Sequence, residues 1–374
     1  MVVIKEVKTK KEIREFINFP IKLYKDSKYY VPLLALGERD IFRASHPYNK
    51  VCDTVFYNAY IDGKIVGRIQ GIIQRPANEK WDQKRVRFTR FDSIDNTLVS
   101  NSLFDAVVKW AKEKGMNEIV GPLGYSDLER EGLLIEGFNE LGTYEEQYNY
   151  DYYQKLIENY GFQKDVDWIE YKIYPPKDGS EEQLIRISEK MMERYNLRLY
   201  QPKTINEFIK KYGKAFFEII DNVYSKLYGT MPLNEEIVNS LIGDFKLLVR
   251  PNRDLALILD KDDKVQGFAL SFVSISDAVR RSKGHITLPF LIRFLKAKRH
   301  PKVVDLGLIG IMPEYESKGI ATLLIGKLIE IMKKDNLEHI ETNLMLEDNH
   351  HVLNLYKRFE YEYTKRRRCF KMDI

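Results

Sequence analysis

The segment from Val303 to Lys334 decides the fold class, and it reads VVDLGLIGIMPEYESKGIATLLIGKLIEIMKK. Residues 303–311 are almost all apolar or glycine, which is typical of a buried strand. From Thr322 to Lys334 the apolar residues recur with helical spacing, so a helix is expected there. A loop that contains Gly319 lies between them. The segment therefore predicts a strand, a loop and a helix in succession.

A similar order of predicted elements occurs on either side of a break at Tyr174–Ser180, where two prolines and a glycine interrupt the pattern. Hairpins that end at Gly67 and Gly267 are followed in each half by a short helix and a strand, with nearly the same separation between the two copies. This self-similarity indicates a duplication. We expect an α/β fold with a mixed sheet of α+β type and two domains, residues 1–176 and 177–374.

The composition is that of an ordinary globular protein, with 374 residues, 31% of them charged, and a formal net charge of +5. This weak net charge gives no support to nucleic acid as a partner. The two cysteines, Cys52 and Cys369, form no CxxC motif, which excludes a disulfide framework and a thiolate zinc site. No signal-peptide run is present and no stretch reaches the ~18 consecutive apolar residues of a membrane span, so a cytoplasmic protein is expected.

The loop glycine, Gly319, removes side-chain bulk where backbone N–H groups converge at the start of the predicted helix. Such donors, together with the helix dipole, suit a pyrophosphate anion. Farther along, Asn349 and Tyr356 are two helical turns apart and share one helix face. A glycine before a helix is also a common packing feature, so the pattern gains its meaning from this context.

These motifs resemble those of the GNAT superfamily, the acetyl-CoA-dependent N-acetyltransferases. The stretch Pro313–Ala321 resembles that superfamily's acyl-CoA pyrophosphate loop, and Asn349 with Tyr356 resembles its Asn-then-Tyr helix. The resemblance covers Leu197 to Ile374 well. It implies that acetyl-CoA or another acyl-CoA is the co-substrate.

The resemblance also assigns roles to individual positions. The amides of 318–321 would hold the pyrophosphate, the strand 308–311 would pair with pantetheine, and Tyr356 would protonate the departing thiolate. The residues implied in cofactor binding are Leu308, Ile309, Gly310, Ile311, Ser317, Lys318, Gly319, Ile320, Ala321, Thr322 and Asn349.

Acyl transfer from a thioester to an amine requires alignment of the amine, removal of its proton, and stabilisation of the oxyanion and thiolate. Asp305, on the central strand where several family members keep a glutamate, is the candidate base or water relay; the alternative is a surface aspartate at a strand end. Tyr356 is the candidate acid; the alternative is a core aromatic. Glu316 stands where the family's loop opens with Gln or Arg, a repulsion of about 1 kcal/mol toward phosphate that Lys318 can offset.

The first half lacks this chemistry, because Leu98, Ser100 and Ile157 occupy the positions of the loop glycine, the loop alanine and the tyrosine. A leucine there would fill the space of a pyrophosphate, so we expect a degenerate GNAT-like domain that serves as a substrate or partner domain. Its segment 121–153 is rich in acids and tyrosines and resembles a group of uncharacterised bacterial tandem GNAT-like proteins. This segment could line a cleft for a cationic amine or form a plug between the domains.

Two basic segments remain. The insertion Asp277–Lys302 has no acid after Asp277, and its stretch Pro289–Lys296 predicts an amphipathic helix. That helix could lie on an anionic membrane or guide an acyl chain, or it could dock with a solvated basic face. The run Lys365–Arg368 could meet a nucleotide 3′-phosphate, but we favour a guard on an exposed edge strand.

The predicted function is transfer of an acyl group, most simply acetyl, from acyl-CoA to a small-molecule amine acceptor in a ternary complex. Two alternatives stay open: a non-catalytic acyl-CoA-binding or interaction protein, suggested by Glu316 and the degenerate half, and a lipid-related acyltransferase at a membrane surface. No metal is assigned, because the adjacent His350 and His351 would point about 100° apart on a helix.

Overall fold

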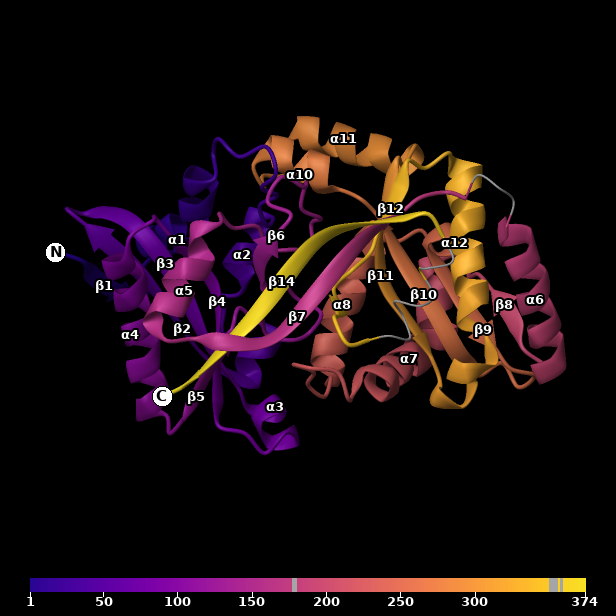
Figure 1. Ribbon diagram of the computed structural model, residues 1–374, viewed down its shortest axis with the longest axis horizontal. Coiled ribbons are helices and arrows are strands. Elements are labelled where there is room, and N and C mark those ends of the chain that lie inside the picture. The colour runs from indigo at the N-terminus through magenta and orange to yellow at the C-terminus, as the bar shows by residue number, and fades with distance from the viewer. Residues whose placement is uncertain (177–179, 350–355, 357–358) are drawn as a thin grey trace.

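The computed structural model of the chain describes residues 1–176, 180–349, 356 and 359–374. Within them the strands form one continuous 14-stranded sheet that runs through both halves of the molecule (Figure 1). In spatial order the main strands are β1 (Val3–Glu6), β2 (Cys52–Ile61), β3 (Lys64–Gln74), β4 (Arg85–Ser93), β5 (Glu118–Gly121), β14 (Tyr361–Asp373), β7 (Gln163–Ile173), β12 (His339–Glu341), β11 (Val303–Ile311), β10 (Val265–Val273), β9 (Leu255–Leu259) and β8 (Arg198–Tyr200). Two short strands pair at the side, β6 (Leu133–Glu136) with β14 and β13 (Met345–Leu346) with β7.

Helices pack against this sheet in both halves (Figure 1). Those of the first half are α1 (Lys10–Leu23), α2 (Ala35–Asp40), η1 (Pro47–Lys50), α3 (Arg75–Lys80), α4 (Thr97–Glu113) and α5 (Tyr152–Tyr160). Those of the second half are α6 (Ser180–Tyr195), α7 (Ile205–Tyr224), α8 (Glu235–Leu248), α9 (Pro251–Asp254), α10 (Ser276–Ser282), α11 (Leu288–Arg299), η2 (Pro313–Lys318) and α12 (Ala321–Asp335). On β10, Phe268 and Leu270 join the cluster of α7 while Ala269 joins that of α12, as the two-residue period of a strand requires. Helices α7 and α12 therefore cover opposite faces of the sheet.

The two halves share one central unit, a strand, a helix and a parallel strand. In the first half it is β4, α4 and β5, and in the second half it is β11, α12 and β12. All the other strand pairs are antiparallel among the described residues, so the sheet is mixed. The predicted mixed α/β fold is confirmed.

The two long strands at the centre are exchanged between the halves. β7 comes from the first half of the chain but pairs with β12 of the second, and β14 comes from the second half but pairs with β5 of the first. The two strands also pair with each other along most of their length, so they tie the halves together (Figure 1). The predicted domain boundary after residue 176 falls next to residues 177–179, which lie outside the described ranges, and it stays a prediction.

Four buried charged side chains lie next to one another at the paired strands β7 and β14. We call them the central charge cluster: Glu146, Glu170, Lys365 and Arg367. The Nζ of Lys365 lies 2.8 Å from Glu146 and 2.7 Å from Glu170, and the Nε of Arg367 lies 2.5 Å from Glu170. The expectation that Lys365–Arg368 guard an exposed edge is wrong, because β14 lies inside the sheet with a strand on each side. The basic run neutralises acids that are distant in the sequence.

Candidate functional site

The central strands of the second half separate at the point where a ligand would enter. β11 and β12 pair in parallel over only three positions, from Val303 to Asp305, and β12 then ends at Glu341. From Leu306 to Ile311 the side of β11 that faces away from β10 has no strand partner within the described residues; we call this the β11 edge. A register shift against β10 leaves Gly307 as an extra, bulged residue. An added Cβ at Gly307 would lie 2.2 Å from the Phe272 ring, so the bulge needs glycine.

Two side chains form hydrogen bonds with backbone groups of the β11 edge. The hydroxyl of Tyr224, the last residue of α7, donates to the carbonyl oxygen of Ile309 at 2.7 Å and accepts from its N–H at 3.1 Å. The side-chain amide of Asn343 donates to the carbonyl oxygen of Gly307 at 3.0 Å. Because both Ile309 groups meet one hydroxyl, they point away from β10. The edge is thus held by exchangeable side-chain contacts rather than by a strand.

The Gly319 turn follows at the end of this edge. Gly319 is exposed, has φ +73°, and a Cβ there would meet no atom within 4 Å, so none of the described side chains closes the turn. Helix α12 starts at Ala321 behind Ile320, whose side chain has no oxygen to cap the first amides. The side chains of Glu316 and Ser317 lie outside the described part of the structure.

The side chain of Lys318 lies between two aromatic rings. Its Nζ lies 4.6 Å from the ring centroids of both Tyr195 and Tyr315, a double cation–π contact. The ammonium is therefore held beside the turn, next to α6. Thr322, also implied in cofactor binding, is buried in the first turn of α12.

The matching helix of the first half is capped. The Oδ1 of Asn96 accepts from the amides of Leu98 at 2.9 Å and Val99 at 3.3 Å. Leu98 itself is 70% exposed, and the expectation that its side chain fills the anion position stays a prediction. Helix α4 therefore has a side-chain cap at its start, whereas α12 has none among the described residues. Ile157 is fully buried in the core of this half.

Asp305 lies on β11 opposite Glu341 of β12, and both carboxylates are buried. The pKa of Asp305 is held well above its usual range, mainly by burial and then by repulsion from Glu341 and Glu146. Its Oδ1 has no hydrogen-bond partner among the described residues. The alternative of a surface aspartate is therefore wrong, and Asp305 adjoins the central charge cluster.

Tyr356 is buried among the side chains that join α12 to the sheet, including Ile325 and Ile329. Burial raises its pKa, and repulsion from Tyr224 raises it further. The two phenols therefore share one electrostatic environment. The backbone N–H of Asn349 donates to Leu346 at 2.9 Å. His350 and His351, like most of the predicted helix after Asn349, lie outside the described residues.

A small pocket beside Tyr224 lies at the junction of the two halves, and we call it the junction pocket. Its volume is about 10 Å³. The lining residues are Asp127, Leu128, Ile220, Asp221, Tyr224, Ser225, Thr230, Met231 and Leu233. Burial, reinforced by repulsion from Asp221, raises the pKa of Asp127 to about 6. The acidic segment of the first half thus reaches the helix that carries Tyr224, a juxtaposition that the sequence did not reveal.

The same segment also acts as a structural plug. Arg130 donates to the carbonyl oxygens of Val31 and Tyr144, and Glu146 accepts from Lys365. One end of segment 121–153 therefore lines the junction pocket and the other is locked into the central charge cluster, while a cleft for a cationic amine stays a prediction.

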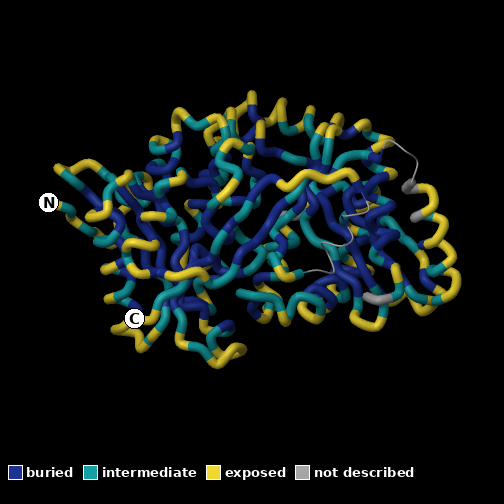
Figure 2. The backbone as a smooth tube through the Cα atoms, in the orientation of Figure 1, coloured by how far each residue is buried: buried dark blue, intermediate teal, exposed yellow. Residues whose placement is uncertain are grey.

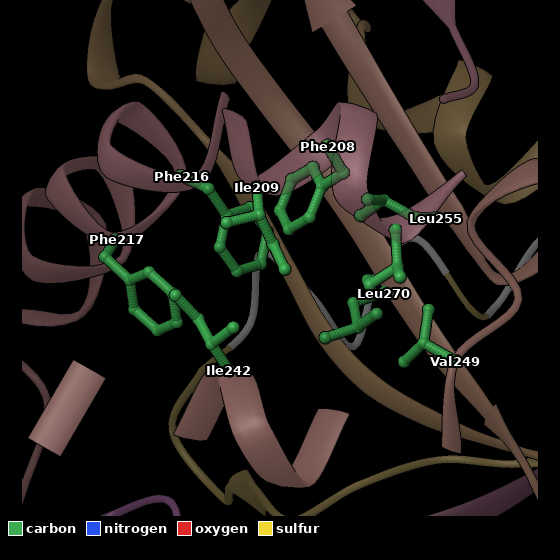
Figure 3. Close-up of a pocket in the computed structure, with 9 residues that line it drawn as sticks. Phe208, Ile209, Phe216, Phe217, Ile242, Val249, Leu255 and Leu270 are labelled. Carbon is green, nitrogen blue, oxygen red and sulfur yellow. The ribbon is translucent and has the colours of Figure 1, made fainter. Parts of the chain in front are cut away.

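A second cavity, of about 20 Å³, lies between α7, α8 and the sheet (Figure 3). Its lining is wholly apolar and includes Phe208, Phe216, Ile242, Leu255 and Leu270. A space of this size admits little more than one water, and its lining offers that water no hydrogen bond. The cavity shares the α7 face of the sheet with Tyr224.

Comparison with known proteins agrees with this architecture. The Acetyltransferase (GNAT) family model matches residues 216–361. Protein YghO of Escherichia coli strain K12 is 24% identical over 376 residues, with 98% of this chain and 94% of that protein covered. The bacterial ceramide synthase of Caulobacter vibrioides strain NA1000 / CB15N is 24% identical over 320 residues, with 83% and 80% covered.

A solved structure, a tandem GNAT protein from the clavulanic acid biosynthesis pathway, has a TM-score of 0.59 at 9% identity and covers 100% of this chain and 98% of its own. Among the described helices none is both long and apolar enough to cross a bilayer. Within the same residues there is no group of three or more His, Cys, Asp or Glu side chains suited to a metal.

Proposed function

Since residues 216–361 match the Acetyltransferase (GNAT) family model and the fold is similar to that of a tandem GNAT protein, we propose that the chain transfers an acyl group from acyl-CoA to the nitrogen of an amine. The observation that carries this proposal is the β11 edge, which has no strand partner among the described residues and leads directly to the open Gly319 turn. An extended chain with amides could pair along such an edge, and a diphosphate could end at such a turn. The edge and the turn follow each other as the pantetheine and the diphosphate do in acyl-CoA.

In this proposal the second half holds the donor. The amides of 318–321 bind the diphosphate, and residues 308–311 pair with the pantetheine once Tyr224 has left Ile309. Ser317, Thr322 and Asn349 complete the site. The absence of a side-chain cap at the start of α12, among the described residues, supports this assignment, and the Asn96 cap on α4 argues against a second donor site in the first half.

The acceptor amine would lie at the junction of the halves, where Asp127 and Asp221 offer negative charge beside Tyr224. Its nitrogen attacks the thioester carbonyl carbon, the C–S bond breaks, and the amide forms. The amine proton passes to Asp305, directly or through water, and the phenol of Tyr356 protonates the thiolate. The raised pKa of Asp305 makes its ionised form a stronger base than an ordinary aspartate.

A second candidate keeps the reaction but changes both substrates to amphiphiles, a long-chain acyl-CoA and a lipid-like amine. The similarity to a bacterial ceramide synthase favours it. The apolar cavity beside α7 is on the face where such a chain would need room, although it would have to widen to hold one.

Titration calorimetry of the full chain with CoA and acetyl-CoA tests the donor site. A Gly319→Glu variant should lose binding, because it places a carboxylate at the diphosphate. Gly63→Glu is the matched control, since Gly63 has φ +74° and equally open surroundings but lies in a hairpin of the first half. Absence of binding to the wild-type chain, or equal loss in both variants, would refute the donor site.

Thiol release with a panel of amines then separates an enzyme from a non-catalytic acyl-CoA binder. The panel pairs acetyl-CoA and palmitoyl-CoA with small amines and with long-chain amino alcohols. Turnover with the short pair supports the first candidate, and turnover confined to the long pair supports the second. Tight binding without turnover in any pair would contradict both.

A further inference from the structure

Helix α11 turns an apolar stripe toward solvent. Leu288, Leu291, Ile292 and Leu295 follow helical spacing, are between 43% and 71% exposed, and form what we call the α11 patch. The neighbouring Ile286 is 52% exposed and extends the patch. In Figure 1 α11 lies along the outer rim of the molecule, and in Figure 2 this rim is largely exposed. A contiguous apolar stripe on the surface marks a contact site.

The opposite face of the helix is already docked. Phe290 is buried and packs with Val31, Ile275 and Val279, and Phe294 is partly buried against the same cluster. The α11 patch therefore cannot be explained as the face that holds the helix to the protein. The expected docked helix with a solvated basic face is only half right, because the exposed face is apolar at its centre.

Positive charge flanks the patch. Exposed Arg293, Lys296 and Arg299 lie on α11, and exposed Arg281 and Lys283 precede it. The sequence has no acid from residue 278 to residue 302. An apolar centre between cations is complementary to an anionic bilayer surface, where acyl chains lie beneath negative headgroups. A protein partner that covered the patch would need acids placed on both sides of an apolar strip.

We propose that α11 binds the surface of an anionic membrane, with the α11 patch in the boundary between headgroups and acyl chains and the flanking cations at the phosphates. The helix lies in the plane of the surface and does not cross it. This attachment is a property of the second half's surface and does not depend on the acyl-transfer proposal.

Co-sedimentation of the full chain with vesicles tests the proposal. The vesicles are phosphatidylcholine alone and phosphatidylcholine with phosphatidylglycerol, and the readout is the bound fraction, without any turnover. Leu291→Glu/Leu295→Glu should lower partition onto anionic vesicles by more than about tenfold. Leu98→Glu/Ile187→Glu is the matched control, because it changes two exposed apolar helix residues elsewhere, and it should bind like the wild type.

Charge is tested separately. Lys296→Gln should lower partition by about fivefold, and added salt should weaken wild-type binding. The proposal is overturned if the wild-type chain stays in solution with anionic vesicles, if it binds neutral vesicles equally well, or if the α11 variant binds like the control. Sedimentation velocity tests whether a second copy of the chain covers the α11 patch. A wild-type dimer that the α11 variant abolishes would mean that a second copy, not lipid, covers the patch.

Discussion

Replacing Tyr224 with phenylalanine should have opposite effects on the stability of the fold and on its affinity for acyl-CoA. The variant keeps the ring that packs beside β11 but removes the hydroxyl that binds both the N–H and the carbonyl of Ile309. If acyl-CoA pairs with the β11 edge, it must first displace this hydroxyl. Removing the hydroxyl should therefore weaken the fold and strengthen the binding of the ligand.

The size of both effects follows from the two hydrogen bonds. Each neutral bond contributes about 1 kcal/mol net, so the free energy of unfolding should fall by about 1–2 kcal/mol. A ligand that no longer displaces these bonds gains up to the same amount, and about 1.4 kcal/mol corresponds to a tenfold lower Kd. We expect acetyl-CoA to bind Tyr224→Phe up to about tenfold more tightly.

Urea denaturation measures the first effect and titration calorimetry the second. Tyr228→Phe is the control, because its hydroxyl binds Asp165 at 2.5 Å and not the β11 edge. The control should lose stability without a gain in affinity. If Tyr224→Phe loses stability but binds acetyl-CoA no more tightly than the wild type, the phenol does not stand in the ligand's place and the pairing argument is wrong.

Three further predictions concern the cluster, the junction pocket and the acid. Lys365→Met should lower the free energy of unfolding by about 3–5 kcal/mol in urea denaturation, because it leaves buried carboxylates with only one of their two cations. Lys302→Met, at an exposed ion pair, should cost under about 1 kcal/mol, and similar losses in the two variants would contradict the cluster's role. The folded pKa of Asp127, about 6, lies above its ordinary value, so the fold retains this proton longer and loses stability as the pH rises from about 4 to above 6. Asp127→Asn should remove that loss, a relative gain of roughly 3 kcal/mol at pH 7.5, and parallel stability curves would refute it. Tyr356→Phe should lower kcat by about 10²-fold in thiol-release assays while the Kd for acetyl-CoA stays unchanged, and full turnover would exclude it as the acid.

Local patterns predicted the central parts of the fold well. The strand at 303–311 and the following helix were expected because their periodicity is set by burial on neighbouring elements. The place of β14 was not predicted. Its basic run looks like a solvent-exposed segment, and only Glu146 and Glu170, far away in the sequence, make it an interior strand. Pairing between distant strands leaves no mark in a local pattern.

The same limit applies to the site. The open turn at Gly319 was visible because a glycine before a helix is a local motif. Tyr224 was missed because it reaches the β11 edge only through the packing of α7 on the sheet, and Asp127 because it reaches the junction pocket only where the two halves meet. In α11, apolar residues occur on two sides, at Phe290 and at Leu291, and periodicity alone does not say which side docks.

The exchange of β7 and β14 between the two halves has a consequence for the synthesis and folding of the chain. A ribosome must synthesise the chain through residue 373 before the first half receives the strand that closes its sheet between β5 and β7. A fragment that stops at residue 176 would leave two bare strand edges, which are templates for aggregation. We therefore expect neither half to fold as an independent module, and we expect the nascent chain to expose unpaired strand edges until translation is nearly complete.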